Sequence, residues 1–234
     1  MYLLPFPVLG ALLAWATLYF LGFERQRWGE FLLGLAAFFM AMIVQNPVQQ
    51  LSLFGMGITP NEDVVARGLA FTVGVSLWLG LVAGTVQEGV KYLLVKGKDI
   101  GTGLFLGLGF GVTEAFVIAG AALAGSMAVG TPLEVPLISA LLSMVERYLV
   151  VLFHVGTAAY LAHAYAEGYG REALIAVIGL HAVVDSLAAY YHLTKSEPTM
   201  YATELITALA ALWLLRRVVP KARAELPREE EVLW

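Results

Sequence analysis

The sequence predicts an all-α fold, a polytopic membrane helix bundle of about seven transmembrane helices. Two observations support this fold class. Of the 234 residues, 59% are hydrophobic and 14% are charged, whereas about 25% of the residues of a typical soluble domain are charged. The hydrophobic residues also form long runs, and about 20 consecutive apolar residues are needed to cross the hydrocarbon core of a bilayer. We therefore expect a multi-pass integral membrane protein with a single transmembrane domain at residues 1–219.

The expected spans are separated by short connections and lie at residues 2–23, 29–46, 65–95, 100–126, 133–165, 171–191 and 199–217. The first span begins at Met1 without a basic region or a small-residue cleavage site, so we interpret it as a retained helix and not as a signal peptide. The longest connection, residues 47–63, contains Gly and Pro and is expected to be an outer loop with room for a short interfacial helix. Residues 220–234 are expected to form a charged cytoplasmic tail.

Lys and Arg residues indicate how the bundle is oriented. They concentrate in the first, third and fifth connections and at the C-terminal end, at Arg25, Arg27, Lys96, Lys98, Arg171, Arg216, Arg217, Lys221, Arg223 and Arg228. The intervening connections hold only Arg67 and Lys195. Because basic connections stay in the cytoplasm, we predict an N-terminus outside, a C-terminus in the cytoplasm and a location in a prokaryotic plasma membrane.

Composition also excludes several kinds of chemistry. The chain contains no cysteine, which rules out disulfide bonds, thiolate metal sites and a thiol nucleophile. Its formal net charge of −4 gives no reason to expect a nucleic-acid partner. The expected surroundings of the chain are membrane lipids.

Five ionisable side chains interrupt four consecutive apolar spans: Glu88, Glu114, His154, His181 and Asp185. At a helical rise of about 1.5 Å per residue, they lie roughly 10 to 20 Å from the cytoplasmic ends of their spans. Charges at such depths are costly, so these groups usually pair, face a wet cavity and mark a functional site. Carboxylates and imidazoles are also the ligands of metal sites that activate water. The sequence therefore predicts one shared polar site suited to a metal ion.

The spacing of these residues predicts which of them act together. His181 and Asp185 are four residues apart and share one helix face, so Asp185 can bind the same ion as His181 or can orient its imidazole. Glu88 and Lys91 are three residues apart and can form an ion pair. The alternative is a purely structural role, in which such an ion pair, or a single histidine in the membrane, only joins helices.

The fifth span carries a second set of polar residues. Arg147 and His154 are seven residues apart and lie on one stripe of the helix. Glu146 can neutralise Arg147 or a group on another helix, and a structural and a functional role for Glu146 and Arg147 both stay open. Glu204, near the outer end of the last span, is expected at the membrane interface.

The fourth span offers a surface for close helix packing, because small residues recur every four positions at Gly103, Gly107, Gly111, Ala115 and Ala119. Ridges of this kind let membrane helices approach one another closely. Glu114 lies beside the ridge and is therefore expected to be buried against neighbouring helices.

Four motifs in residues 85–190 follow one another in a recognisable order: Gln87-Glu88-x-x-Lys91, Phe110-x-x-x-Glu114, Phe153-His154 and His181-x-x-x-Asp185. This series resembles that of the YhfC and PrsW families of intramembrane metalloproteases, and the Glu146-Arg147 pair is closer to YhfC. These families belong to a superfamily with the CAAX prenyl endopeptidases, the Abi proteins and, as a distant relative, the Aph subunit of γ-secretase.

The resemblance implies a glutamate that activates water, histidines that bind a metal or polarise that water, and cleavage of a peptide bond in or near the membrane. By motif, the implied positions are Glu88, Glu114, the histidines His154 and His181, and the final acid Asp185. The family has a further glutamate where this chain has Gln87. An inactive scaffold like Aph therefore stays an alternative.

The leading hypothesis is a zinc-type hydrolase whose substrate is a membrane protein or peptide. The divalent metal would be bound by the two histidines and by one or two of Glu114 and Asp185. Glu88 would act as the general base, and Lys91 or Arg147 would stabilise the oxyanion or balance charge. The depth of the site suggests access from the cytoplasmic side.

Two other functions use the same residues. In a scaffold or binding protein, the polar cluster would only hold helices together and would bind no metal. In a transporter, buried carboxylates and histidines would carry ions, but the sequence shows no internal repeat of the kind that many transporters have.

Overall fold

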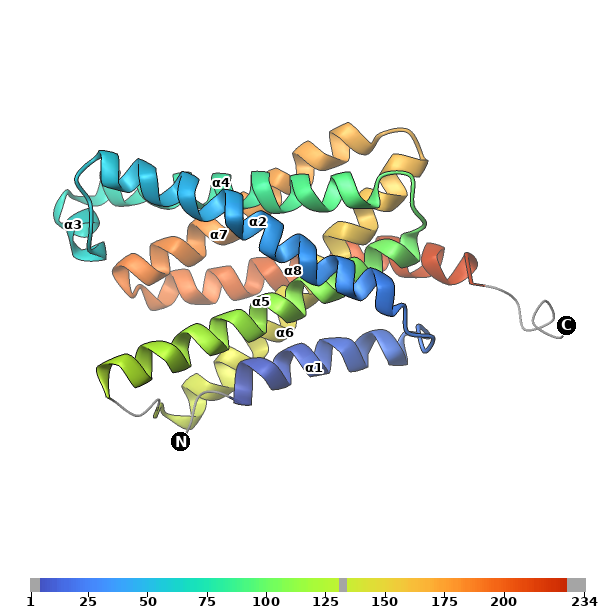
Figure 1. Ribbon diagram of the computed structural model, residues 1–234, viewed down its shortest axis with the longest axis horizontal. Helices are drawn as coiled ribbons and strands as arrows, with labels where there is room; N and C mark the ends of the chain where they lie inside the picture. Colours follow the sequence, from blue (N-terminus) through green and yellow to red (C-terminus); the bar gives the residue numbers. More distant parts are fainter. Residues whose placement is uncertain (1–4, 131–133, 227–234) are drawn as a thin grey trace, which may run out of the picture.

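A computed structural model describes residues 5–130 and 134–226, and all the elements in these ranges are helices (Figure 1). The first residues of the predicted first span, the start of the predicted fifth span and most of the predicted tail lie outside the described residues. Within them, the helices are α1 (Pro5–Phe20), α2 (Trp28–Gly55), α3 (Asn61–Ala66), α4 (Leu69–Val95), α5 (Ile100–Val129), α6 (Leu137–Ala166), α7 (Gly170–Thr194) and α8 (Glu197–Ala224). The all-α prediction is confirmed.

In the described part of the chain, five helices are long and apolar enough to cross a membrane, namely α2, α4, α5, α6 and α7. These helices support an integral, multi-pass membrane protein. The first helix, α1, is apolar but has only 16 residues. The last helix, α8, has 28 residues and carries Arg216, Arg217, Lys221 and Arg223 toward its C-terminal end.

Two helices continue through a proline past their predicted ends. Helix α2 continues past Pro47 to Gly55, and α3 begins at Asn61, so the predicted loop at 47–63 is for the most part helical. The extension is held by tertiary contact, because Gln49 Nε2 donates a hydrogen bond of 2.8 Å to the carbonyl oxygen of Leu79 on α4. Contacts with neighbouring helices are one reason that a proline is tolerated inside a membrane helix.

Helix α8 likewise continues past Pro220 and ends at Ala224, beyond the predicted end at residue 217. Val219 and Ala222 in this extension are buried. Glu225 follows directly, and its Oε2 accepts a hydrogen bond of 3.0 Å from the backbone N–H of Ile100, at the start of α5. The end of α8 is therefore part of the bundle and not of a free tail.

Glycine brings α5 very close to α6, as the small-residue ridge predicted. A Cβ atom at Gly107 would lie 2.3 Å from the carbonyl oxygen of His154, and one at Gly103 would lie 2.6 Å from Cα of Ala159. Only a residue without a side chain fits at such distances. Because His154 sits at this crossing, the ridge fixes its position relative to α5.

A second glycine contact joins α4 to α7. A Cβ atom at Gly84 would lie 2.8 Å from the carbonyl oxygen of Ile178, and one at Gly80 would lie 2.4 Å from that of Ala182. Glu88 follows Gly84 by one helical turn, and His181 lies on the facing part of α7. The same close approach therefore sets the side chains of Glu88 and His181 against each other.

Candidate metal centre

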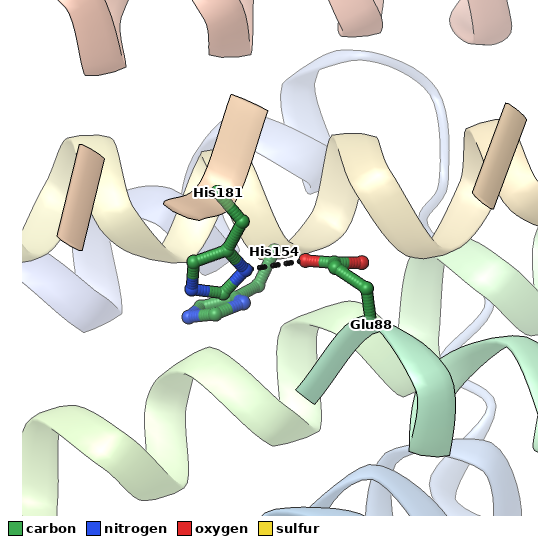
Figure 2. Close-up of side chains that lie close together, drawn as sticks. All are labelled: Glu88, His154 and His181. Carbon is green, nitrogen blue, oxygen red and sulfur yellow. Dashed lines mark hydrogen bonds and ion pairs between the residues drawn. The ribbon is translucent and has the colours of Figure 1, made fainter. Parts of the chain in front are cut away.

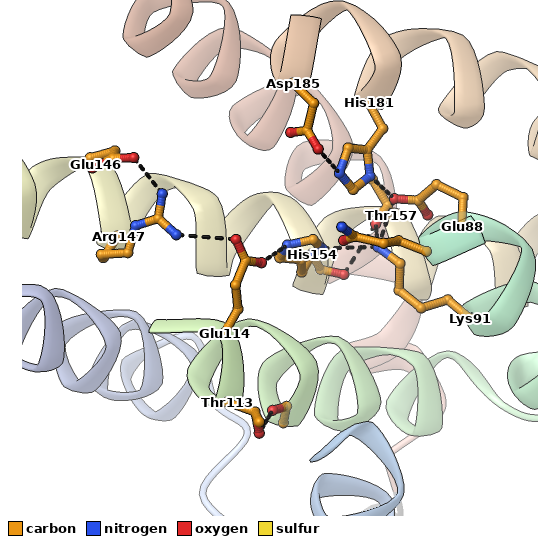
Figure 3. Close-up of polar contacts among 12 residues, drawn as sticks. Glu88, Lys91, Thr113, Glu114, Glu146, Arg147, His154, Thr157, His181 and Asp185 are labelled. Atoms are coloured by element: carbon orange, nitrogen blue, oxygen red, sulfur yellow. Dashed lines mark hydrogen bonds and ion pairs between the residues drawn. The ribbon is translucent and has the colours of Figure 1, made fainter. Parts of the chain in front are cut away.

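The rare ionisable side chains converge on one polar cluster in the middle of the bundle (Figure 3). Helix α4 contributes Glu88 and Lys91, and α5 contributes Glu114. Helix α6 contributes Arg147 and His154. Helix α7 contributes His181 and Asp185 from adjacent turns of one face. The prediction that four consecutive spans turn these groups toward one place is confirmed.

Three of these residues form a group that could hold a metal ion (Figure 2). Glu88, His154 and His181 each offer one ligand atom, and these atoms lie within 4.8 Å of one another. All three side chains are buried. His181 Nδ1 and Glu88 Oε1 are 2.6 Å apart. Two imidazoles and one carboxylate are a donor set of catalytic zinc sites.

A carboxylate lies against the other ring nitrogen of each histidine. Glu114 Oε2 is 2.7 Å from His154 Nε2, and Asp185 Oδ2 is 3.5 Å from His181 Nε2. Histidines that bind metals usually have such a carboxylate partner, which fixes the orientation of the ring and raises its basicity. The predicted pairing of His181 with Asp185 on one helix face is confirmed.

The three-residue group differs in membership from the predicted ligand set. The sequence placed Glu114 and Asp185 beside the histidines as ligands and Glu88 apart as the base. In the structure, Glu88 forms the group with the two histidines and lies against His181, whereas Glu114 and Asp185 lie at the outer nitrogens of the histidines. The reason is helix packing, because α4 approaches α7 through Gly80 and Gly84 and delivers Glu88 to the centre.

The second oxygen of Glu88 is available to a ligand. Glu88 Oε1 lies 2.6 Å from both Lys91 Nζ and His181 Nδ1. Glu88 Oε2 is buried and has no hydrogen-bond partner among the described residues. A buried acceptor without a partner is uncommon and points to an ion or water that completes its environment. This oxygen is the observation that best fits a metal ion at the group.

The formal charges around the group also favour a cation. The cluster contains four carboxylates and two cationic side chains: Glu88, Glu114, Glu146, Asp185, Lys91 and Arg147. With both imidazoles neutral, this leaves two negative charges in excess. A divalent cation would balance them, and unbalanced charge inside a protein is costly.

Lys91 is the buried cation of the group. Its Nζ atom donates to Glu88 Oε1 at 2.6 Å and to Thr157 Oγ1 at 2.8 Å, and lies 3.0 Å from His154 Nδ1. The Glu88–Lys91 ion pair predicted from their spacing is confirmed. An ammonium group has only donors, so we assign His154 Nδ1 as an acceptor and its Nε2–H as the donor to Glu114.

Arg147 lies on the other side of Glu114. Its Nη1 atom donates to Glu114 Oε1 at 3.1 Å, and its Nη2 atom pairs with Glu146 of the same helix. Arg147 and His154, which the sequence placed on one stripe of the helix, both contact Glu114. Glu146 neutralises Arg147, which was one of the two expectations for it.

Together these contacts form one line of side chains in the order Glu146, Arg147, Glu114, His154, Lys91, Glu88, His181 and Asp185 (Figure 3). Exposure is lowest in the middle and highest at the ends: Glu88 is 0% exposed, whereas Asp185 and Glu146 are 33% and 39% exposed. Both ends line the same cavity. The line therefore bends back on itself and does not lead through the bundle.

The cavity has a volume of about 50 Å³, which is room for water molecules. His154, His181, Glu114, Asp185 and Arg147 line it, whereas Glu88 and Lys91 do not. Its lining includes the first half of α8 and the second half of α7. The connection between α7 and α8 lies at the end of the bundle opposite the basic connections (Figure 1).

Helix α8 closes the cavity with residues that the motif argument left out. Thr203, Glu204 and Thr207 line it, although Glu204 was expected at the membrane interface. A signal for this was present in the sequence, because Thr203 and Thr207 are four residues apart and form a polar stripe beside Glu204 on an apolar helix.

Gln87, which stands where the resemblance implies a further glutamate, points away from the group. Its Nε2 atom donates a hydrogen bond of 3.0 Å to Oε1 of Gln45 on α2, and both side chains are buried. Gln87 therefore joins α4 to α2, while Glu88 faces the histidines.

The chain matches no protein-family model, and comparisons with curated proteins and with solved structures give no match either. The functional interpretation therefore depends on the geometry of the site.

Proposed function

We propose that this chain is a membrane-embedded metallopeptidase, which hydrolyses a peptide bond of a membrane protein or peptide. The observation that carries the proposal is the buried group of Glu88, His154 and His181, whose ligand atoms lie within 4.8 Å of one another. The carboxylates at the outer ring nitrogens and the free Oε2 atom of Glu88 support it.

In this proposal Glu88, His154 and His181 hold the metal, and zinc is the ion best matched by two imidazoles and a carboxylate. Such an ion supplies a Lewis acid, which polarises a carbonyl group and makes water more acidic. Glu114 keeps the ring of His154 in place, and Asp185 does the same for His181. This ligand set exchanges the roles first expected for Glu88 and Asp185.

Asp185 is the best placed general base. It lines the cavity, it is one-third exposed, and its contact with His181 is long, at 3.5 Å. Glu114 also lines the cavity, but it is tied to both His154 and Arg147. A carboxylate that takes a proton from water must be free to contact that water, which favours Asp185 over Glu114.

Arg147 supplies positive charge at the cavity. It lines the cavity wall and is held between Glu114 and Glu146. A fixed cation beside the reacting carbonyl stabilises the negative charge that develops on its oxygen. Because both carboxylate partners hold the guanidinium in place, little reorganisation is needed during the reaction.

Substrate must reach the site through the cavity wall. The cavity of about 50 Å³ has room for water but not for a peptide segment. Helix α8 closes the cavity with Thr203, Glu204 and Thr207, so the proposal requires α8 to move when the substrate binds. Access is then from the α7–α8 end of the bundle, and not from the cytoplasmic side suggested by depth alone.

We further propose that seven helices, α1, α2 and α4 to α8, cross a prokaryotic plasma membrane, with the N-terminus outside and the C-terminus in the cytoplasm. The basic connections lie at one end of the bundle (Figure 1). There Arg223 Nε donates to the carbonyl oxygen of Leu21 at 2.6 Å. Because the chain has no cysteine, single cysteines introduced at Glu24 and at Glu62 would report the two sides by labelling with an impermeant maleimide.

The proposal is tested by measuring bound metal and proteolysis for the purified chain reconstituted in lipid. His181→Ala is expected to lose the metal and at least about 100-fold in activity, while its helical content stays that of the parent. Asp185→Asn is expected to keep the metal and lose activity, because an amide cannot accept the proton. The proposal would be wrong if His181→Ala retained full activity.

A scaffold is the second candidate function, and one observation favours it. Five charged side chains of the cluster are already paired with a group of opposite charge, namely Glu88, Lys91, Glu114, Arg147 and Glu146, and Lys91 also contacts His154. A scaffold predicts no bound metal, and His181→Ala would then lower the thermal midpoint without affecting any turnover. Transport is less well supported, because both exposed ends of the polar line reach one cavity.

A further inference from the structure

We propose that Lys91 is a built-in competitor of the metal ion, which occupies the ligand atoms of the Glu88–His154–His181 group until a divalent ion displaces it. This inference rests on the proposed function, because it concerns the same site. It adds that the site has two states, one closed by the Lys91 ammonium and one open to metal.

The contacts of Lys91 are those of a cation in a binding site. The side chain is buried, and Nζ contacts Glu88 Oε1 at 2.6 Å, Thr157 Oγ1 at 2.8 Å and His154 Nδ1 at 3.0 Å. An ammonium group has three donors, and three acceptors surround it here. The ring of Phe110 adds a fourth contact, with its centroid 5.1 Å from Nζ.

Two of these acceptors are atoms that a metal ion would need. An imidazole nitrogen offers one lone pair, so His154 Nδ1 cannot accept a hydrogen bond from Lys91 and bind a metal at the same time. The other nitrogen of His154 faces Glu114 at 2.7 Å, which leaves Nδ1 as its ligand atom toward Glu88. Metal binding through His154 and departure of Lys91 Nζ are therefore one event.

Electrostatic repulsion, like the shared lone pair of His154, prevents Lys91 and a metal ion from occupying the site together. An ammonium and a divalent ion at the same carboxylate repel each other, and burial strengthens that repulsion. The free Oε2 atom of Glu88 gives an arriving ion a first ligand before Lys91 leaves. The long, flexible stem of Lys91 then lets Nζ turn toward the end of α4, which is four residues away at Val95.

The experiment measures the affinity of the purified full-length chain for Co²⁺ and Zn²⁺ in detergent, with the visible spectrum of Co²⁺ as a report of its ligands. In Lys91→Met the stem remains and the charge is lost, and we expect at least about ten-fold tighter binding of both ions. Lys96→Met is the matched control, because Lys96 is an exposed lysine near the end of α4. Its affinity is expected to equal that of the parent.

A second variant keeps Lys91 but removes one of the contacts that hold its ammonium group in place. Thr157→Val removes the hydrogen bond that Lys91 makes outside the metal ligands, and we expect binding a few-fold tighter than in the parent. This variant decides the question if Lys91→Met does not fold. His154→Ala combined with Lys91→Met is expected to lose the gain, since the gain depends on the nitrogen that Lys91 releases.

The outcomes separate the two proposals. If the parent binds metal and neither Lys91→Met nor Thr157→Val binds more tightly, the competitor role of Lys91 is wrong and the metallopeptidase proposal stands. If neither the parent nor any Lys91 or Thr157 variant binds metal, the metal site itself is wrong. Tighter binding that also appears in Lys96→Met would show an unspecific effect of lost charge and would overturn the inference.

Discussion

Two ion pairs of nearly the same length lie in opposite environments of this protein. Lys91 Nζ and Glu88 Oε1 are 2.6 Å apart in the middle of the bundle, and both side chains are fully buried. Arg27 Nη2 and Asp99 Oδ2 are 2.7 Å apart at the basic end, and their side chains are 32% and 41% exposed. The distance between the charged atoms therefore does not show whether an ion pair belongs to a buried site or only joins the ends of two helices.

The exposed pair has a structural task. Asp99 is the N-cap residue of α5 and accepts a hydrogen bond of 2.8 Å from the backbone N–H of Thr102. Arg27 directly precedes α2, so the pair joins the start of α2 to the start of α5. Water surrounds both groups and screens their attraction. The buried pair has no such screening, because both side chains are fully buried.

The largest expected difference between the two pairs is the loss in free energy of unfolding when the carboxylate charge of each pair is removed. Glu88→Gln leaves the Lys91 ammonium buried without a counter-ion and is expected to lower the free energy of unfolding by about 3 to 5 kcal/mol. Asp99→Asn retains the N-cap oxygen and is expected to cost less than about 1 kcal/mol. Unfolding in mixed detergent micelles measures both values, and equal losses would contradict the comparison.

A smaller loss of stability is expected from disturbing the close packing of α5 against α6, which lies beside the buried pair. Gly107→Ala places a methyl group 2.3 Å from the carbonyl oxygen of His154, and it is expected to destabilise the fold by about 1 to 3 kcal/mol. Gly120 lies on the same helix and has open space around its Cβ position. Gly120→Ala is therefore the matched control, and a helix-favouring substitution there is expected to be neutral or slightly stabilising.

The thermal midpoints of the two glycine variants and of the parent, measured in one detergent, provide the comparison. Gly107→Ala is also expected to weaken metal binding, because α5 and α6 can no longer hold Glu114 against His154 at 2.7 Å. Unchanged metal binding in a clearly destabilised Gly107→Ala would mean that the crossing of α5 and α6 does not position the site.

The smallest expected effect is the pH dependence of the exposed pair. Partial burial would raise the pKa of Asp99, but hydrogen bonds from Arg27 and Thr102 outweigh it and lower the pKa to about 2. A lowered pKa in the folded state means that the pair stabilises the protein above about pH 4. Its contribution is lost as the pH falls from about 4 toward 2, and exposure limits it to less than about 1 kcal/mol.

The difference in stability between the parent and Asp99→Asn, followed from pH 6 to pH 2, checks this expectation. The two stability curves should approach each other in the acid range, since protonated Asp99 resembles an amide in charge. A difference that stays constant over the whole range would mean that the negative charge of Asp99 does not contribute to the stability.

Contacts within one helix could be predicted from the sequence with residue-level accuracy. Glu88 with Lys91 and His181 with Asp185 were expected from spacings of three and four residues, and both contacts are present. The small-residue ridge of α5 was expected to bring a neighbour close, and α6 is that neighbour. Such contacts follow from the helical repeat alone, which is the same in every helix.

Contacts between helices could be predicted only in outline. Nothing in the spacing shows that Glu114 meets His154, that Glu88 meets His181, or that Gln87 turns to Gln45. Those pairings depend on how each helix is rotated and shifted against its neighbours. The continuation of α2 past Pro47 depends in the same way on a partner, the carbonyl oxygen of Leu79.

The sequence by itself determined a helical membrane protein with its rare acids and imidazoles at similar depth on four spans, because hydrophobicity and helical period are properties of the local chain. The tertiary structure alone decided that Glu88 enters the group with His154 and His181, that Lys91 contacts His154, and that α8 closes the cavity with Glu204. The physical reason is that helix rotation and approach are set by side-chain volume at the crossings, where Gly84 and Gly107 let backbones nearly touch.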